Sequence, residues 1–386
     1  MSEKIRVGIV GIGNMGSSHL RNYKEDKMPE VEITAVCDIK EERLQWAEKE
    51  FPEIARFDCY DKMLESGLCD AILIAVPHYD HPPMAIKAFE KGLHVMTEKP
   101  AGVYTKQVRE MNEAAAKTDK TFGIMYNQRT NPMYRKAREI VKSGEYGEIK
   151  RVNWIITDWF RTQAYYNSGG WRATWSGEGG GVLLNQCPHN LDLWQWICGM
   201  PDKIKAVCRV GQWHDIEVED DVTIYAEYPN GASGVFITTT GDCPGTNRLE
   251  ITLDRAKFIC EDNKLRMYVL EHNTSDIIAN SENGFAKTDG EWVDVELEGE
   301  NNQHSGVMNA FAANILRGED LIAKGEEGIN GLTISNAAFL SSWLDKTINL
   351  PLDEDLFYSE LEKRIKTSKV KTNVVERTKE DMSSTY

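Results

Sequence analysis

The chain has 386 residues, of which 41% are hydrophobic and 27% are charged, and its formal net charge is −16. This composition is typical of a globular protein, and the length is enough for two domains with ordinary hydrophobic cores. The acidic balance argues against a nucleic-acid partner, and no apolar run approaches the ~18 residues of a membrane span.

The first predicted element is a short buried strand, Ile5 to Val10, followed at once by Gly11-x-Gly13-x-x-Gly16 and a helix through Leu20. A GxGxxG motif alone is weak, but between a strand and a helix it fits the needs of a dinucleotide. Gly11 permits a tight turn, Gly13 lets a pyrophosphate approach the backbone, and Gly16 lets the helix pack on the strand. The N–H groups and positive dipole end of the helix then face the phosphates.

A second predicted strand, Ile33–Cys37, ends at Asp38, 22 residues beyond Gly16. A carboxylate at this position accepts hydrogen bonds from the ribose hydroxyls of NAD and repels the 2′-phosphate of NADP. The alternative is a glycine-rich turn beside a surface acid, but that does not explain the order of strand, glycines, helix, strand and acid. The sequence therefore predicts NAD as the cofactor. Its predicted binding residues are Gly11, Ile12, Gly13, Asn14, Met15, Gly16, Asp38, Val76, Pro77, Glu98 and Lys99.

Residues 1–127 alternate strands with helices, which predicts an α/β fold with a doubly wound parallel sheet, a Rossmann domain. The further predicted strands are Arg56–Cys59, Ala71–Val76, His94–Thr97 and Phe122–Tyr126. The predicted helices are Glu41–Phe51, Pro83–Lys91 and Thr105–Lys117.

Residues 128–358 have runs of strands with few helices between them, which predicts a C-terminal α/β domain with a large, mostly antiparallel open sheet. We expect this domain to bind the substrate and to form a homodimer or homotetramer through its strands within about 148–300. Residues 359–386 are predicted as a helix to about Ile365 and a tail that is flexible alone but able to order against a partner subunit. The predicted helices are Met133–Lys142, Ser305–Leu316 and Gly331–Asp345, and the predicted strands are Ile149–Asp158, Lys203–Val210, Val222–Tyr228, Ser233–Thr240, Arg248–Leu253, Lys257–Cys260 and Leu265–Val269.

The cysteines and histidines predict neither disulfides nor a metal centre. The eight cysteines include no Cys-x-x-Cys pair, and several lie in apolar runs, which is typical of reduced thiols in a cytoplasmic protein. The start of the chain leaves no room for a signal peptide before the first strand, which favours the same location. His78-x-x-His81 and His214-x-x-Glu217 have metal-ligand spacing, but neither has a third ligand nearby in the sequence, so we interpret them as loop residues.

Two predicted strands end in residues suited to chemistry. Ala71–Val76 leads into Pro77, and His94–Thr97 leads into Glu98-Lys99-Pro100. Ligands of doubly wound sheets bind beyond the carboxyl ends of the strands, so we expect Lys99 beside the nicotinamide ring. Its amine can hydrogen-bond a substrate hydroxyl and stabilise the alkoxide as hydride leaves, whereas acting as the base itself would need a pKa lowered to about 7–8. A solvated surface lysine is the alternative.

A second cluster begins with Gly179-Gly180-Gly181 and continues through Asn185, His189 and Asp192 into an apolar run. The run predicts a helix, and in a helix Asn185 and His189, four residues apart, would share a face. His189 has an ordinary pKa suited to accepting a proton near neutral pH. A buried structural histidine is an equally good interpretation.

A third stretch, residues 158–172, combines several aromatic rings with two arginines and flexible glycines. Sugar rings present apolar C–H faces and many hydroxyls, so such a loop suits a carbohydrate. The alternative is an ordinary long loop that covers the sheet.

Together these motifs resemble the Gfo/Idh/MocA oxidoreductases, named for glucose–fructose oxidoreductase and inositol dehydrogenase. The resemblance covers about residues 4–352, and its most specific motif is Glu-Lys-Pro at 98–100. It implies an N-terminal Rossmann domain, a C-terminal domain whose open sheet often forms the subunit interface, and NAD(P)-dependent hydride transfer on sugars, inositols or related polyols.

The resemblance also implies roles for individual residues. The family's catalytic lysine falls on Lys99 and its catalytic histidine on His189. The position four before the histidine is commonly aspartate, and here it is Asn185, whose amide can orient His189 but cannot stabilise an imidazolium as a carboxylate does. Asp192, one turn on, could supply that charge. The predicted catalytic residues are therefore Lys99, His189 and Asn185, and the predicted substrate-binding residues are Tyr126, Asn127, Arg129, Trp159, Arg161, Tyr166, Trp171, Arg172, Asn185 and His189.

The sequence leaves three functions open. The first is an NAD-dependent dehydrogenase of a sugar, glycoside or cyclitol, with C3 of a hexose as one position of attack. The second is a glycosidase in which NAD oxidises C3 transiently, the aglycone is eliminated, water adds and the hydride returns. The third is a dinucleotide sensor without enzymatic activity, which the presence of both Lys99 and His189 disfavours.

Overall fold

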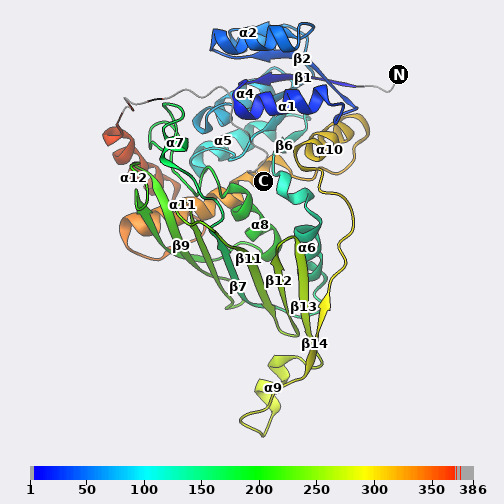
Figure 1. Cartoon of the computed structure of the whole chain (residues 1–386), viewed down its shortest axis with the longest axis vertical. Helices are drawn as coiled ribbons and strands as arrows, with labels where there is room; N and C mark the ends of the chain where they lie inside the picture. Colours follow the sequence, from blue (N-terminus) through cyan, green and yellow to red (C-terminus); the bar gives the residue numbers. More distant parts are fainter. Residues whose placement is uncertain (1–3, 370, 372–373, 375–386) are drawn as a thin grey trace.

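Two β-sheets organise the computed structural model, which describes residues 4–369, 371 and 374 (Figure 1). Within these residues the first sheet has six parallel strands in the order β3-β2-β1-β4-β5-β6. Helices lie on both of its faces, which is why its strands are continuous apolar runs. The strands are β1 (Ile5–Val10), β2 (Val31–Cys37), β3 (Ala55–Phe57), β4 (Ala71–Ile74), β5 (His94–Thr97) and β6 (Phe122–Ile124).

The first sheet confirms the predicted doubly wound fold. Its strand order reverses between β1 and β4, which creates the crevice where dinucleotides bind. β4 and β6 each end two residues earlier than predicted, and α3 escaped prediction because six residues are too few for a periodic pattern. The connecting helices are α1 (Asn14–Lys24), α2 (Glu41–Glu50), α3 (Tyr60–Glu65), α4 (His81–Glu90) and α5 (Thr105–Ala115).

The second sheet has nine strands among the described residues, in the order β14-β13-β12-β11-β7-β10-β9-β8-β15. Neighbouring strands are antiparallel except β7 and β10, which confirms the predicted open and mostly antiparallel sheet. The two short edge strands, β14 and β15, were not predicted. The strands are β7 (Ile149–Ile156), β8 (Lys203–Val210), β9 (Glu219–Glu227), β10 (Ser233–Thr239), β11 (Asn247–Leu253), β12 (Ala256–Glu261), β13 (Lys264–Leu270), β14 (Gly290–Asp294) and β15 (Ile348–Asn349).

Helices cover one face of the second sheet. They are α6 (Pro132–Ser143), α8 (Pro188–Cys198) and α11 (Gly328–Leu344). Trp194 of α8 stacks on Phe236 of β10 with ring centroids 5.4 Å apart, and both side chains are fully buried. Alternate residues of central strands such as β9, β11 and β12 point into this core, as the period-two pattern requires.

The opposite face of the second sheet carries a partly apolar row. Ile155 pairs with Ile237, Ile237 with Thr223, and Thr223 with Val207, so these four side chains share one face. Val207 is 52% exposed and Ile155 is 38% exposed. Tyr225, in the adjacent row, is also exposed. An apolar face of this kind is typical of an interaction surface.

The helix α10 (Gln303–Arg317) brings the chain back to the first sheet. Its buried residues Val307, Met308 and Phe311 belong to the core formed by β1 and β2, although residues 128–358 were assigned to the second domain. Figure 1 shows α10 beside α1, on the side of the molecule that holds the N-terminal strands. The two units are therefore connected by packing as well as by sequence.

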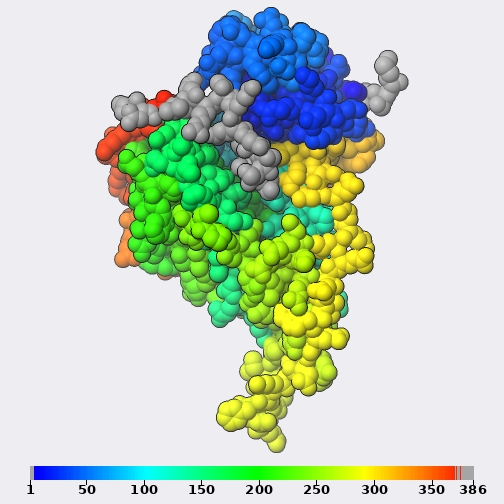
Figure 2. Space-filling model, in the orientation of Figure 1, coloured from blue at the N-terminus to red at the C-terminus, as the bar shows by residue number. Residues whose placement is uncertain are grey.

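The arm formed by residues 271–289, which includes α9 (Thr274–Asn280), projects from the far end of the second sheet (Figures 1 and 2). The helix α12 (Glu354–Thr367) extends slightly beyond the predicted end at Ile365, and the predicted tail lies largely outside the described residues. A short helix, α7 (Gln163–Tyr166), interrupts the loop after β7. Across the described residues we find no helix with the length and apolar character that a membrane crossing requires.

Candidate active site

The glycine fingerprint has the geometry of a pyrophosphate cradle. Gly11 has φ +85°, and a Cβ there would lie 2.5 Å from the carbonyl oxygen of Ala75. A Cβ on Gly16 would overlap the carbonyl oxygen of Gly11, so this glycine is what lets α1 pack on β1. A Cβ on Gly13 would meet nothing within 4 Å, and Gly13 is the residue just before α1. The N-terminus of α1 and the open side of the loop therefore fit a dinucleotide phosphate.

Asp38 lies at the carboxyl end of β2, beside the fingerprint loop. Its Oδ2 accepts a hydrogen bond from the main-chain N–H of Ile12 at 2.7 Å, and its Oδ1 accepts one from Lys40 at 2.9 Å. These bonds fix the carboxylate against the loop, and its oxygens retain further lone pairs for the two hydroxyls of a ribose. Asp38 therefore lies beside the glycine loop, which is the position predicted for the group that binds the ribose of NAD.

Lys99 follows β5, where β4 and β5 end side by side. The N–H of Glu98 donates to the carbonyl of Ile74, which holds the two strand ends together. The Lys99 ammonium donates to the main-chain carbonyl of Asn185 at 2.9 Å, across the junction between the two sheets. Burial lowers the pKa of Lys99, with the positive charges of Arg172 and Arg161 acting in the same direction. The structure thus excludes a freely solvated lysine.

Glu98 has a structural partner that the sequence did not reveal. Its Oε1 contacts Nε2 of His19 on α1 at 2.8 Å, and both side chains are buried. His304 of α10 packs edge-on against His19, with ring centroids 5.5 Å apart. This contact ties α1, β5 and α10 together directly behind Lys99. Glu98 therefore supports the site, and its predicted contact with the cofactor stays a prediction, as do those of Asn14, Met15, Val76 and Pro77.

The glycine cluster forms a turn that places Asn185. Gly179 has φ +83°, and both oxygens of the buried Glu219 carboxylate accept main-chain N–H groups, from Gly181 at 2.8 Å and Leu183 at 2.9 Å. Burial raises the pKa of Glu219 to about 8. The helix α8 begins only at Pro188, so the predicted helical relation between Asn185 and His189 is wrong. Proline at the first helical position sets this start, because its ring fits there and its missing N–H is not needed.

The side chain of Asn185 contacts two groups that were not predicted. Its amide nitrogen donates to Oε1 of Glu178, and its amide oxygen accepts from the hydroxyl of Tyr165 at 3.1 Å and from Gln186 at 3.2 Å. Glu178 is 1% exposed, and its Oε2 accepts the main-chain N–H of Ala173. Asn185 thus lies between Lys99 on its main-chain side and Glu178 on its side-chain side.

His189 lies in the first turn of α8 and is buried, with its ring edge-on to Tyr126 at a centroid distance of 6.2 Å. Burial, together with the nearby positive charge of Lys99, holds the pKa of His189 well below its ordinary value. The imidazole is therefore neutral near pH 7, which is the form that accepts a proton.

Asp192 does not supply the charge that Asn185 lacks. Its two oxygens accept from Nε and Nη2 of Arg129, at 2.8 Å and 2.6 Å, and Oδ1 also accepts from Gln195. Arg129 contacts Glu327 as well, and its guanidinium lies over the ring of Trp196. The carboxylate is thus committed to a buried ion pair, and the suggestion that it compensates for Asn185 is wrong.

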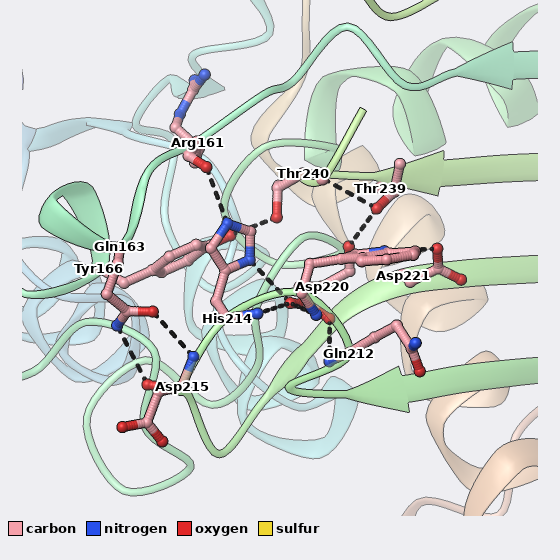
Figure 3. Close-up of polar contacts among 12 residues, drawn as sticks. Arg161, Gln163, Tyr166, Gln212, His214, Asp215, Asp220, Asp221, Thr239 and Thr240 are labelled. Carbon is pink, nitrogen blue, oxygen red and sulfur yellow. Dashed lines mark hydrogen bonds and ion pairs between the residues drawn. The ribbon is translucent and has the colours of Figure 1, made fainter. Parts of the chain in front are cut away.

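In the loop after β7, the side chains of two tyrosines that are adjacent in the sequence have different surroundings. Tyr166 is fully buried and its hydroxyl contacts Thr240 at 2.7 Å (Figure 3). Tyr165 is partly exposed, and its hydroxyl reaches Asn185. His214 fixes the loop by contacting the carbonyl of Arg161 at 2.8 Å and the carboxylate of Asp220 at 2.8 Å. The structure therefore places Tyr165, which was not predicted, beside Asn185, while the predicted role of Tyr166 in binding substrate stays a prediction.

Aromatic and cationic side chains of the same loop lie around Tyr165, near the junction between the two sheets. Arg172 donates to the hydroxyl of Tyr165 and lies over the Tyr165 ring at 4.3 Å and the Trp171 ring at 5.0 Å. Trp171 meets the ring of His78, which follows β4, with centroids 5.6 Å apart. Arg161 lies over the ring of Trp159 at 5.8 Å. All four loop side chains, those of residues 159, 161, 171 and 172, are partly exposed, as a binding surface requires.

Four other predicted site residues are held inside the protein. Tyr126 and Asn127 are buried, with Asn127 bonded to Gln303, and Arg129 and Tyr166 have the partners given above. Their roles in binding substrate stay predictions. The histidines with metal-like spacing are also engaged: His214 as described, and His81 with the carbonyls of Val76 and Pro100.

A dinucleotide cradle with an acid after the second strand, and a partly buried lysine and a buried histidine at the junction of two sheets, are the arrangement expected of an NAD-binding oxidoreductase. Residues 5–126 match the profile described as an oxidoreductase family with an NAD-binding Rossmann fold, and residues 134–259 match the GFO/IDH/MocA C-terminal domain. The chain belongs to the Gfo/Idh/MocA family, and its N-terminal unit is an NAD-binding Rossmann domain.

Two curated relatives to which the chain is similar are named as dehydrogenases of an inositol and of a glucoside. The chain is 31% identical over 200 residues to inositol 2-dehydrogenase of Corynebacterium glutamicum, covering 52% of this chain and 56% of that protein. It is 29% identical over 252 residues to D-glucoside 3-dehydrogenase of Escherichia coli, covering 60% and 68%. The chain spans about half the length of the first curated relatives it matches.

A solved structure covers more of the chain. The WlbA dehydrogenase from Bordetella pertussis, in complex with NADH and UDP-GlcNAcA, is similar with a TM-score of 0.75 and 25% identity. The match covers 91% of this chain and 100% of that one. The similarity therefore extends through both sheets.

Proposed function

We propose that this protein is an NAD-dependent dehydrogenase that removes hydride from a ring carbinol of a sugar, glycoside or cyclitol. The observation that carries the proposal is the contact of the Lys99 ammonium with the Asn185 carbonyl, 2.9 Å across the junction of the two sheets. This contact sets a cation at the carboxyl edge of the nucleotide-binding sheet, beside the helix that holds His189. The relatives named for inositol and glucoside dehydrogenation support the same substrate class.

The residues divide the chemistry between them. Bound NAD supplies the hydride acceptor. His189 is neutral near pH 7 because burial lowers its pKa, and in this form an imidazole nitrogen accepts the proton of the substrate hydroxyl. The Lys99 ammonium donates a hydrogen bond to the same oxygen and stabilises its negative charge until the carbonyl has formed. Asn185 positions Lys99 through its main-chain carbonyl and Tyr165 through its side chain.

The loop of residues 158–172 is the proposed sugar-binding surface. Trp171 and Tyr165 present ring faces, and Arg172 holds both in place through its planar guanidinium. Sugar C–H faces stack on such rings, and the phenol and guanidinium groups hydrogen-bond hydroxyls. We place the oxidised carbon at C3 of a hexose ring, with the Escherichia coli glucoside dehydrogenase as the supporting relative.

The test is an absorbance screen in the NADH band with monosaccharides, inositols and glycosides. A dehydrogenase accumulates NADH together with an oxidised sugar. A glycosidase that recycles its NAD releases aglycone with no net NADH, and a dinucleotide sensor gives neither product. Either of the last two outcomes would contradict the proposal that the protein is a dehydrogenase.

We further propose that the second sheet forms a homodimer or homotetramer in the cytoplasm, within a unit spanning residues 128–358. The support is the row formed by the exposed Ile155 and Val207 and the partly exposed Ile237, which a second copy of the sheet would cover. The eight cysteines, none of them in a disulfide, support a reducing compartment. Val207→Glu should convert the oligomer to a monomer in light scattering. A wild-type monomer at micromolar concentration would remove this proposal.

A further inference from the structure

A buried carboxylate, Glu178, is linked to the candidate catalytic lysine through Asn185, and neither the motifs nor the proposed mechanism uses it. Glu178 contacts the side-chain amide of Asn185, and the main-chain carbonyl of Asn185 accepts from Lys99. We propose that Glu178 is a positioning residue that holds Asn185 and, together with Glu98, supplies the negative charge that keeps Lys99 in its ammonium form. The catalytic part of this proposal rests on the proposed function.

The contacts of Glu178 fix it in one orientation. Its Oε1 accepts from Asn185 and its Oε2 accepts from the N–H of Ala173, so both oxygens are engaged. Its own main-chain carbonyl contacts Nδ1 of His78, at 3.2 Å, and so reaches the residues that follow β4. A carboxylate this deeply buried is costly unless it is hydrogen-bonded and near a positive charge. Glu178 meets both conditions.

The charges around the pair explain why an anion is needed here. Lys99 is partly buried and faces the cations of Arg172 and Arg161, and all three influences lower its pKa. Glu98 opposes this effect most strongly, and Glu178 acts in the same direction as Glu98.

Charged groups of both signs lie near Glu178. Arg172 and Lys371 are the nearby cations, while burial raises the pKa of the Glu178 carboxyl. Glu219, the first residue of β9, is close enough to be influenced by the charge of Glu178.

The sign of the effect follows from these charges. Removing the negative charge of Glu178 leaves the ammonium of Lys99 with less stabilisation, so the pKa of Lys99 falls. The ammonium is the form that stabilises the alkoxide, and it is lost as pH rises through that pKa. The basic limb of the rate–pH profile should therefore move to lower pH in Glu178→Gln, by on the order of 1 pH unit for an adjacent charge.

A measurement without substrate tests the electrostatic part. Competitive acetylation of the full-length protein, read by peptide mass spectrometry across pH, gives the apparent pKa of Lys99. Glu178→Gln should lower it by on the order of 1 unit, whereas Glu217→Gln, a carboxylate on a nearby loop that contacts Ser368 and Trp175, should leave it unchanged. An unchanged value in Glu178→Gln would overturn the proposal whatever the substrate screen shows.

A rescue experiment separates charge from packing. Asn185→Asp alone places two carboxylates in hydrogen-bond contact and should lower the melting temperature. Combining it with Glu178→Gln reverses the amide and the carboxylate while keeping one charge at the contact, and should restore the apparent pKa of Lys99 and the basic limb. Failure of the double variant to recover either quantity, with NADH binding intact, would contradict the role. Recovery of the pKa without turnover of any sugar would instead count against the proposed function alone.

Discussion

Arg129 and Asp192 form a buried two-point ion pair, with Nε–Oδ2 and Nη2–Oδ1 distances of 2.8 Å and 2.6 Å. The arginine comes from the short segment after β6 and the aspartate from α8, one turn beyond His189. The pair therefore links the end of the nucleotide-binding sheet to the helix that carries the candidate base. Its direct effect is on stability and on the position of α8.

Asp192→Ala should destabilise the protein strongly, because it leaves the Arg129 guanidinium buried with only part of its charge compensated. Breaking a buried pair in this way costs about 3–5 kcal/mol. Asp70→Ala is the matched control, since its pair with Arg6 is 40–44% exposed and should contribute below about 1 kcal/mol. Urea unfolding followed by fluorescence measures both. Equal losses in the two variants would contradict this account of Asp192.

Tyr165→Phe and Tyr166→Phe should behave differently although the residues are neighbours. Tyr165→Phe removes the hydroxyl that contacts Asn185, Gln186 and Arg172, so turnover should fall, by about tenfold for a loss near 1.4 kcal/mol. Tyr166→Phe removes a bond to Thr240 and should lower the melting temperature with little change in turnover. Steady-state kinetics and a thermal melt on each variant decide the matter. The reverse pattern would return Tyr166 to the site.

Asp38→Ser should weaken NAD binding and reduce the discrimination against NADP. The carboxylate beside Ile12 is the group expected to bind the ribose hydroxyls and repel a 2′-phosphate. Loss of such a contact corresponds to about 1–3 kcal/mol, or roughly 5- to 150-fold in the ratio of dissociation constants. Titrations with NADH and NADPH measure the ratio, with Asp58→Ser at the end of β3 as a surface control. A wild-type preference for NADPH would show that Asp38 has been misassigned.

The local sequence was sufficient to predict the fold of the nucleotide-binding unit. The strand, the three glycines and Asp38 act through backbone geometry over a short stretch of chain, so their spacing carries the information. The position of Lys99 followed from the same logic, because strand ends of a parallel sheet share an edge.

The polar contacts of the site depend on residues distant in sequence. The pairs of Arg129 with Asp192 and of Glu98 with His19 join different elements, and no local pattern encodes them. The start of α8 could have been predicted, because proline at a first helical position is a known signal and Pro188 stands there. The choice between Tyr165 and Tyr166 depends on which way a one-turn helix faces, which the sequence of that loop does not determine.

The central claim is that Lys99 and His189 carry out hydride transfer chemistry on a sugar ring. The most direct test compares wild type, Lys99→Met and His189→Ala in the NADH absorbance assay, alongside NADH affinity by fluorescence titration. We predict that wild type accumulates NADH with an oxidised sugar, and that each variant loses about 10²–10⁴ in turnover while its NADH affinity stays close to that of wild type. Variants that keep wild-type turnover, or that lose NADH affinity and turnover in equal measure, would contradict the account.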